Sequence, residues 1–133
     1  MPFYDVTAVA EAVGIDAKQL DNILCRNELD GVERRTRGVS RRLSVDAAVT
    51  IQLAAEVAGA LRMPIGQALR VSAAIQQSTD NVLRVSDVVT LHADVATLRA
   101  ATIARLNSAV ELLGRRRRGR PPKLGRGAVV DTG

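Results

Sequence analysis

Apolar residues at helical spacing near the start of the chain predict two short helices. The first covers residues 8–13, with its apolar positions at Val9, Ala10 and Val13. The second covers residues 17–27, with its apolar positions at Leu20, Ile23 and Leu24. Thr7 and Asp16 are the predicted N-caps, because a short side-chain oxygen can accept hydrogen bonds from the free backbone N–H groups of a helix start.

Gly14 separates these helices and predicts a tight turn. Glycine adopts a positive φ at little steric cost, and the small Ala10 leaves room for the second helix to cross close to the first. A small residue, a glycine four positions later and an apolar residue six further on form the pattern of a helix-turn-helix. A bare helical hairpin has the same spacing, so the pattern alone leaves both open.

The later elements follow from the same periodicities. A short extended lead-in is predicted over residues 2–6. Ser44 caps a helix to Leu61 that is apolar almost all round, so we expect it at the centre of the fold. Met63 and Pro64 break it, and a further helix follows over residues 65–76, with the predicted inward positions Ala68, Leu69, Val71, Ser72 and Ile75.

Residues 81–93 alternate in character on both sides of Ser86-Asp87, after a polar linker, and predict a second small hairpin. Asp94 then caps a helix to Leu113. Its predicted apolar stripe consists of Val95, Leu98, Thr102, Leu106, Val110 and Leu113. This helix is long enough to pair with a copy of itself, which predicts a homodimer through residues 94–113. Packing back on its own domain is the alternative, because the stripe drifts from a strict heptad.

Composition excludes several classes of function. Of the 133 residues, only Phe3 and Tyr4 are aromatic, which speaks against recognition of single strands or RNA by base stacking. One cysteine, Cys25, and one histidine, His92, build neither a disulfide framework nor a zinc cluster. No nucleophile–base arrangement, phosphate-binding glycine loop or acidic metal cluster is present in the sequence, so we expect no enzyme and no cofactor.

Positive charge is concentrated in two short segments. The segments 34–42 and 115–126 hold 12 of the 19 basic residues and none of the 14 acidic ones, so the rest of the chain is acidic. Their basic residues are Arg34, Arg35, Arg37, Arg41 and Arg42 in the first, and Arg115, Arg116, Arg117, Arg118, Arg120, Lys123 and Arg126 in the second. Such segregation is typical of a protein that binds a polyanion, because neutralised phosphates release their counterions.

The first basic segment directly follows the helix-turn-helix. Apolar and basic positions alternate from Val32 to Ser44 around Gly38, which predicts a β-hairpin. An arginine-rich hairpin at this place is typical of a wing, whose guanidinium groups clasp phosphates or enter a minor groove. An arginine-rich solvated loop is the alternative.

The polar face of the helix over residues 17–27 supplies the candidates for base contacts. Lys18, Asn22 and Arg26 are spaced to reach base edges or flanking phosphates, because Asn suits adenine and Arg or Lys suits guanine in the major groove. Asp21 either accepts from a cytosine amino group or orients Lys18. An ordinary solvated helix face is the alternative reading of these residues.

From Phe3 to about Ile75 the chain resembles the winged DNA-binding domain of the MerR type. The resemblance is carried by a lead-in tyrosine, the VAEAVGI helix, the Arg-Gly wing and the segment RRLSVDAAVTIQLAAEVAGALRMPIGQALRVSAAI. Leu43-Ser44 stands where the family often has a tyrosine, and the family's metal-sensing cysteines are absent. The resemblance implies that the second helix enters the major groove while the wing holds the flanking backbone.

The last segment, RRRRGRPPKLGRGAVVDTG, has little to bury and is expected to be disordered when free. Its centre, with Arg117, Arg118, Gly119, Arg120, Pro121 and Lys123, resembles the AT-hook. In that motif a Gly-Arg-Pro core lies extended in the narrow, strongly negative minor groove of A·T-rich DNA. A nonspecific basic tail is the alternative.

The sequence therefore predicts a mainly α fold with small β-hairpins: a winged helix-turn-helix domain over 1–78, a hairpin plus helix over 79–113, and a disordered AT-hook-like tail over 114–133. The predicted function is that of a transcriptional regulator that binds double-stranded DNA. We expect the protein to be cytoplasmic and nucleoid-associated and to have no membrane span. Two alternatives stay open. One is an architectural nucleoid protein, and the other is a partner-binding module, such as an antitoxin or phage accessory factor, with a DNA-anchoring tail.

Overall fold

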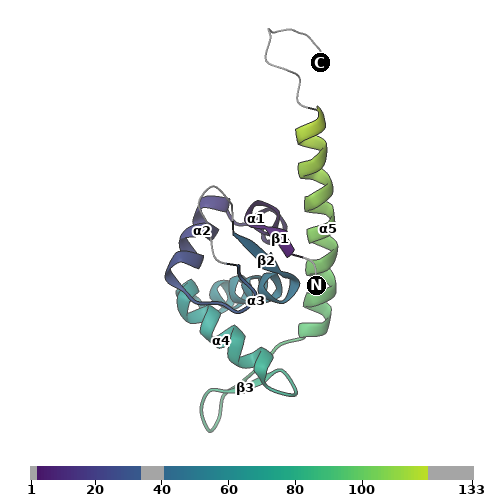
Figure 1. The fold of residues 1–133 in the computed structure, drawn as a ribbon. Coiled ribbons are helices and arrows are strands. Elements are labelled where there is room, and N and C mark those ends of the chain that lie inside the picture. Colours follow the sequence, from purple (N-terminus) through teal and green to yellow (C-terminus); the bar gives the residue numbers. More distant parts are fainter. Residues whose placement is uncertain (1–2, 34–40, 120–133) are drawn as a thin grey trace.

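A computed structural model describes the backbone of residues 3–33 and 41–119, and side chains as far as Arg115. Its helices are α1 (Val6–Val13), α2 (Ala17–Arg26), α3 (Val45–Leu61), α4 (Ile65–Gln77) and α5 (Val95–Gly119). Its strands are β1 (Phe3–Asp5), β2 (Arg42–Ser44), β3 (Val82–Arg84) and β4 (Thr90–His92), paired antiparallel as β1–β2 and β3–β4. The prediction of a mainly α fold with small antiparallel strand pairs is confirmed (Figure 1).

The first helix begins earlier than predicted. Its N-cap is Asp5, whose carboxylate accepts from the Val6 N–H at 3.1 Å, and Thr7 lies exposed inside the helix. The reason is tertiary: β1 pairs with β2 as far as the Asp5–Arg42 pair, so Asp5 is the last extended residue. The prediction of Thr7 as the N-cap was therefore wrong. The residues around Thr7 carry no sign of the pairing between β1 and β2 that sets where the helix begins.

The turn between α1 and α2 has the predicted geometry. Gly14 adopts φ 86°, and the N–H groups of Gly14 and Ile15 both donate to the Ala10 carbonyl, at 2.8 and 3.0 Å. The Asp16 carboxylate then accepts from two N–H groups in the first turn of α2. Ala10 is buried between the helices, as its size suggested. The helical hairpin is thereby fixed at both sides of its turn.

Helix α3 is the centre of the core. It is buried on all sides through its first half, from Val45 to Ala54, except for Asp46, and it contacts α1, α4 and α5. Ser44 caps it, as predicted, by accepting from the Ala47 N–H at 3.1 Å. Arg62 ends it in the left-handed region at φ 53°, and α4 starts after Pro64. Of the predicted inward positions of α4, Ala68, Leu69, Ser72 and Ile75 are buried, while Val71 is partly exposed.

The second hairpin forms between α4 and α5 as predicted. Leu83 pairs with Leu91, and His92 lies exposed in the return strand. In the described residues no single helix is long and apolar enough to cross a membrane; α3 and α4 pass that test only as a pair, and they are bent by 118°.

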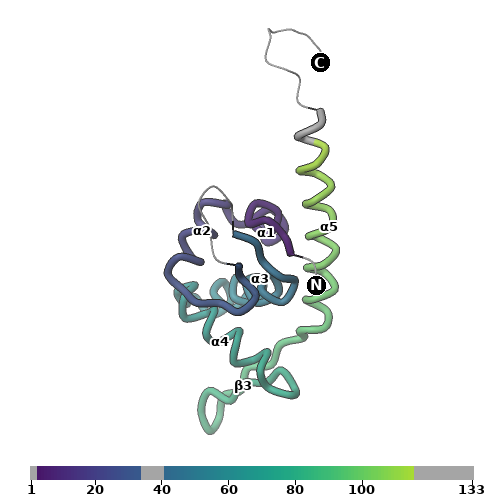
Figure 2. The backbone as a smooth tube through the Cα atoms, in the orientation of Figure 1, coloured from purple at the N-terminus to yellow at the C-terminus, as the bar shows by residue number. Residues whose placement is uncertain are grey.

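Helix α5 packs on α1 and α3 and then runs on past the body (Figures 1 and 2). Its buried residues are Thr102, Leu106 and Ala109, while Val110, predicted on the buried stripe, is 48% exposed. The helix reaches Gly119, the last described residue, and passes the predicted end at Leu113, so the predicted disorder was wrong for residues 114–119. Arginine favours the helix and one internal glycine costs only about 1 kcal/mol, so the basic composition does not stop it.

Candidate nucleic-acid interface

Helix α2 separates its apolar and polar residues cleanly. Leu20, Ile23 and Leu24 are buried against the body, and Lys18, Asn22 and Arg26 are exposed on the other side, four residues apart. Residues four apart on a helix lie on one face. The Asn27 side chain donates to the Ile23 carbonyl at 2.8 Å and closes the end of the helix. The predicted face therefore exists, on a helix held at both ends.

The two ends of the predicted wing that the structure describes are paired with each other, as in a β-hairpin. Val32 bridges Leu43 in antiparallel fashion, with the Ser44 N–H donating to the Gly31 carbonyl and the Glu33 N–H to the Arg42 carbonyl, each at 2.8 Å. Gly31 has φ 86°, and a Cβ there would meet the Ser44 Oγ at 2.2 Å. Arg34, Arg35, Arg37 and the predicted turn at Gly38 lie outside the described residues.

Arg41 is committed to an internal contact. Its guanidinium pairs with the Asp21 carboxylate and also donates to the Cys25 Sγ at 3.3 Å and to the Asp21 carbonyl at 3.4 Å. The hydrogen bond to Cys25 and the charge of Asp21 outweigh burial, so the pKa of Arg41 is raised above its ordinary value. Only 14% of the Arg41 side chain is exposed. The sequence predicts Arg41 as a DNA contact, and Asp21 as an acceptor for a cytosine amino group or a residue that orients Lys18. The structure pairs Arg41 with Asp21, which ties the residue immediately before β2 to α2.

Arg42 is placed differently from its neighbour. Successive strand residues point to opposite sides, and the Arg42 side chain is 54% exposed. Its guanidinium carbon lies 5.8 Å from the centre of the Phe3 ring, and its Nε is 3.9 Å from a Glu33 oxygen. Both partners orient the side chain and leave about half of it accessible. The predicted phosphate contact of Arg42 stays a prediction, and about half of the side chain is accessible for it.

The residues predicted to form an AT-hook fall at the edge of the described chain. The backbone of Arg117, Arg118 and Gly119 is the last part of α5, whereas Arg120, Pro121 and Lys123 lie outside the described residues. A minor-groove core requires an extended chain, so an extended segment that starts before residue 120 would need the last turn of α5 to open.

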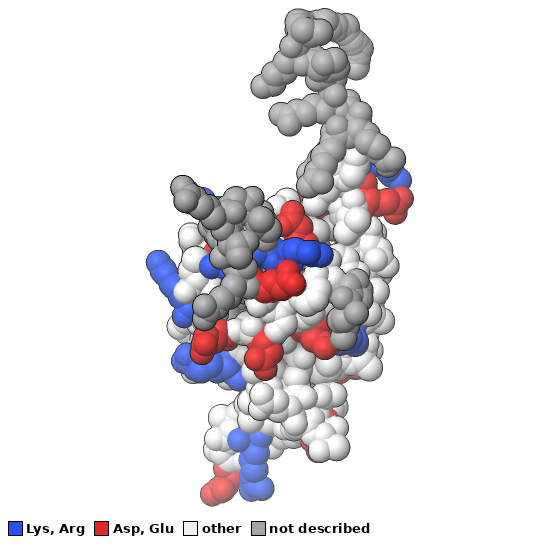
Figure 3. Space-filling view, viewed as in Figure 1, with Lys and Arg blue, Asp and Glu red and all other residues white. Residues whose placement is uncertain are grey.

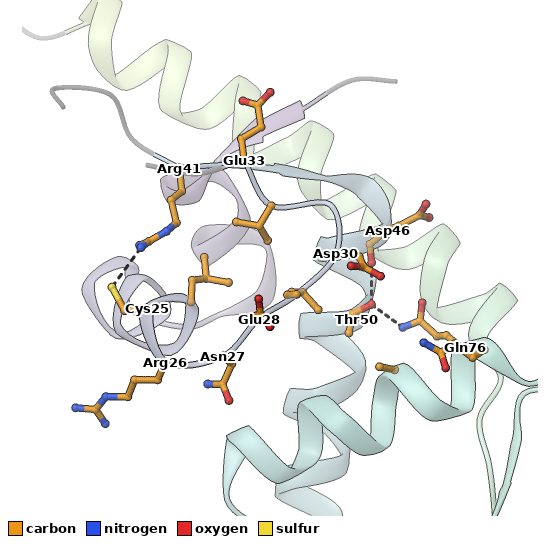
Figure 4. A pocket seen from close by; sticks show the side chains of 15 residues that line it. Cys25, Arg26, Asn27, Glu28, Asp30, Glu33, Arg41, Asp46, Thr50 and Gln76 are labelled. Carbon is orange, nitrogen blue, oxygen red and sulfur yellow. Dashed lines mark hydrogen bonds between the residues drawn. The ribbon is translucent and has the colours of Figure 1, made fainter. Parts of the chain in front are cut away.

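A cavity of about 900 Å³ opens beside the C-terminal turn of α2 (Figure 4). Its walls come from the end of α2, the chain that follows it, Arg41, the start of α3 and the end of α4. On its floor the Thr50 hydroxyl donates to the Asp46 carbonyl at 3.0 Å and accepts from the Gln76 amide at 2.8 Å. Glu28 and Asp30 line it, while Arg26 points outward (Figure 4). Sequence reasoning missed this cavity, because its walls are distant in the chain.

Acidic side chains lie among the basic ones on the face that carries α1 and α2 (Figure 3). Within the described ranges, no group of three or more His, Cys, Asp or Glu residues is placed to hold a metal ion. No family model, curated protein or solved structure matches the chain.

Proposed function

We propose that this protein is a regulator that binds double-stranded DNA with α2 in the major groove. The observation that carries the proposal is the exposed row of Lys18, Asn22 and Arg26 on a helix whose opposite face is buried. The helix belongs to a helix-turn-helix hairpin and lies beside the paired ends of an arginine-rich segment. The resemblance to MerR-type domains supports the same docking.

Each exposed side chain of α2 suits a distinct contact. Asn22 can make two hydrogen bonds to adenine, which presents a donor and an acceptor in the major groove. Lys18 and Arg26 suit guanine edges or phosphates on either side. Arg42 and the arginines of segment 34–40 would hold the flanking backbone. The ion pair between Arg41 and Asp21 supports this division, because it ties the residue immediately before β2 to α2.

The basic end of the chain supplies a second, weaker contact in this proposal. Arg115 at the outer part of α5 is followed by further arginines and by the AT-hook-like segment around Arg120. A contact tethered to the first one acts at high effective concentration, so affinity can rise without a larger folded interface. An A·T-rich minor groove next to the main site is the proposed target of the tail.

Titration of A·T-rich and G·C-rich duplexes at two salt concentrations tests the proposal. We expect Arg120→Ala to weaken binding to A·T-rich duplexes selectively, and Asn22→Ala to relax base preference. The logarithm of the binding constant should fall with the logarithm of salt by about 0.9 per phosphate contact. Equal losses for both variants on every duplex would contradict the division of labour, and absence of duplex binding by the unmodified chain would contradict the function.

A homodimer remains part of the proposal, with a narrower surface than residues 94–113. The middle of α5 is already buried against α1 and α3, so the pairing surface would lie around the exposed Val110 and Leu112. Sedimentation equilibrium of Val110→Asp against the unmodified chain tests it. A concentration-dependent dimer that the substitution abolishes supports this surface, and a monomer at all concentrations contradicts it.

The tip of the second hairpin favours a partner-binding module as the second candidate. Val85, Val88 and Val89 are exposed there by 57%, 90% and 46%. The turn is rigidly bonded, with the Ser86 hydroxyl accepting from the N–H groups of Val88 and Val89. If this candidate is right, a stable hetero-complex forms and Val88→Ser breaks it without changing duplex affinity.

A further inference from the structure

We propose that the cavity beside α2 binds a small organic cation, an amine or guanidine with a short apolar body. The cavity of about 900 Å³ has the size of a ligand site, which ordinarily measures 300–1,000 Å³. Its lining joins apolar side chains, amide groups and carboxylates, so it can take a ligand that has both an apolar part and a charged part. The apolar lining residues are Leu24, Leu29, Val32 and Ala73.

The charges of the lining select a cation. Four carboxylates border the cavity: Glu28, Asp30, Glu33 and Asp46. Asp46 pairs with Arg99 of α5, and Glu33 lies 3.9 Å from Arg42. Glu28 and Asp30 make no ion pair or hydrogen bond with any residue that the structure describes. Two carboxylates thus remain for a ligand, and both border the same cavity (Figure 4).

The two arginines of the lining do not satisfy these carboxylates. Arg41 is held by Asp21 and Cys25, and Arg26 points away from the cavity (Figure 4). The amides of Gln76 and Gln77 at the far wall add hydrogen-bonding groups. A ligand ammonium or guanidinium at Glu28 and Asp30 would therefore supply a charge that the described lining lacks, while its hydrocarbon part covers Leu29 and Val32.

Occupation of the cavity would act on α2. The wall includes Leu24, Cys25 and Arg26 in the last turn of α2, and also Arg41, which pairs with Asp21 of α2. Without a ligand, the carboxylates of Glu28 and Asp30 repel DNA phosphates near Arg26. A bound cation offsets that repulsion, so we expect the ligand to strengthen duplex binding. This second step rests on the proposed DNA-binding function, whereas ligand binding itself does not.

Calorimetric titration of the full chain without DNA, at low salt and pH 7, tests the site. The probe is 4-phenylbutylamine, and its neutral analogue 4-phenylbutanol is the ligand control. We expect saturable one-to-one binding of the amine, at least tenfold weaker binding of the alcohol, and a loss of about tenfold or more in amine affinity in Glu28→Gln/Asp30→Asn. The matched protein control is Asp80→Asn/Asp87→Asn, which removes the same charge outside the cavity and should leave the affinity unchanged.

Three results would overturn the proposal: no saturable binding of the amine, equal binding of the alcohol, or equal losses in both double variants. Circular dichroism of each variant shows that it is folded, which all four exposed positions permit. Repeating duplex titrations with saturating amine tests the coupling separately. Amine binding without any duplex binding would contradict the proposed function and leave the cavity assignment standing.

Discussion

Helices α2 and α5 both present basic side chains, but the protein holds them in different ways. In α2, three buried apolar residues within ten hold the whole helix, and its cations stand directly opposite them. In α5, the fully buried residues end at Ala109, and Arg115, with the arginines after it in the sequence, comes six positions later. Cations on α2 therefore have fixed positions relative to the body, whereas Arg115 lies on the outer part of α5, which runs on past the body (Figure 1).

The difference bears on what each set of cations can recognise. Base readout needs side chains placed to within hydrogen-bonding geometry, which a rigidly packed helix supplies. Phosphate attraction needs charge alone and tolerates imprecise placement. Under the proposed DNA-binding function, we therefore expect sequence preference to come from α2 and general duplex affinity from Arg115 at the outer part of α5.

The largest effect is expected where α5 is attached to the body. Leu106 is fully buried, and Leu106→Ala should lower the free energy of unfolding by about 2–5 kcal/mol, because it leaves a cavity between α5 and the core. Val110, one turn further on, is 48% exposed, and Val110→Ala should change stability by about 0.5 kcal/mol or less. Urea unfolding measures both. Similar losses for the two variants would show that α5 is anchored beyond Ala109.

The next effect separates readout from charge. Asn22→Ala should cost about 1–3 kcal/mol on duplexes selected from a random pool and little on unselected duplexes. Arg115→Ala should weaken binding to all duplexes alike and lower the salt slope by about 0.9. Fluorescence anisotropy on both duplex sets gives these values. A sequence-dependent loss for Arg115→Ala would contradict the assignment.

Ion pairs on the two helices offer a third contrast. In Asp21–Arg41 the side chains are 25% and 14% exposed, whereas in Asp46–Arg99, which ties α5 to α3, they are 57% and 41% exposed. Double-mutant cycles by urea unfolding should give a coupling of about 1–2 kcal/mol for the first pair and about 0.2–1 kcal/mol for the second, because solvent screens the exposed pair. Salt should reduce the second coupling more. Equal couplings would remove this distinction between the helices.

The smallest effect concerns the start of α5. Asp94 accepts from the Thr97 hydroxyl and from the Thr97 N–H, and these bonds lower the pKa of Asp94 below its ordinary value of 3.8. A lowered pKa stabilises the fold above the ordinary value, and that contribution is lost as pH falls through the lowered one. Asp94→Ala should therefore have a lower free energy of unfolding than the unmodified chain at pH 7, and this difference should narrow below about pH 3.8. A gap independent of pH would exclude the carboxylate's charge as the cause.

Local signals predicted much of this fold. Gly14, Asp16 and Ser44 act through neighbours a few residues away, so the turn and two helix caps follow from short sequence patterns. The polar face of α2 follows in the same way from the spacing of Leu20, Ile23 and Leu24.

Features that depend on contacts between distant parts of the chain escaped sequence reasoning. Asp5 caps α1 because a strand 37 positions later pairs with β1 through the Asp5–Arg42 pair. Arg41 joins Asp21 across 20 residues, and no spacing rule distinguishes it from the neighbouring arginines. The cavity beside α2 combines four separate stretches of chain, within 24–33, 41, 46–50 and 73–77. Helix α5 continues past Leu113 because arginine has a high helix propensity. A run of arginines therefore does not by itself indicate disorder.

Duplex titration of a charge-matched pair of double variants in the full chain tests the central claim, that the exposed face of α2 binds DNA. Lys18→Ala/Arg26→Ala removes two cations from that face, and Arg62→Gly/Arg84→Ala removes two exposed cations elsewhere, with glycine suiting the positive φ at position 62. The account predicts at least a tenfold loss of affinity and a salt slope lower by about 1.8 for the first variant, from two phosphate contacts at about 0.9 each, with little change for the second. Equal losses in the two variants would contradict it.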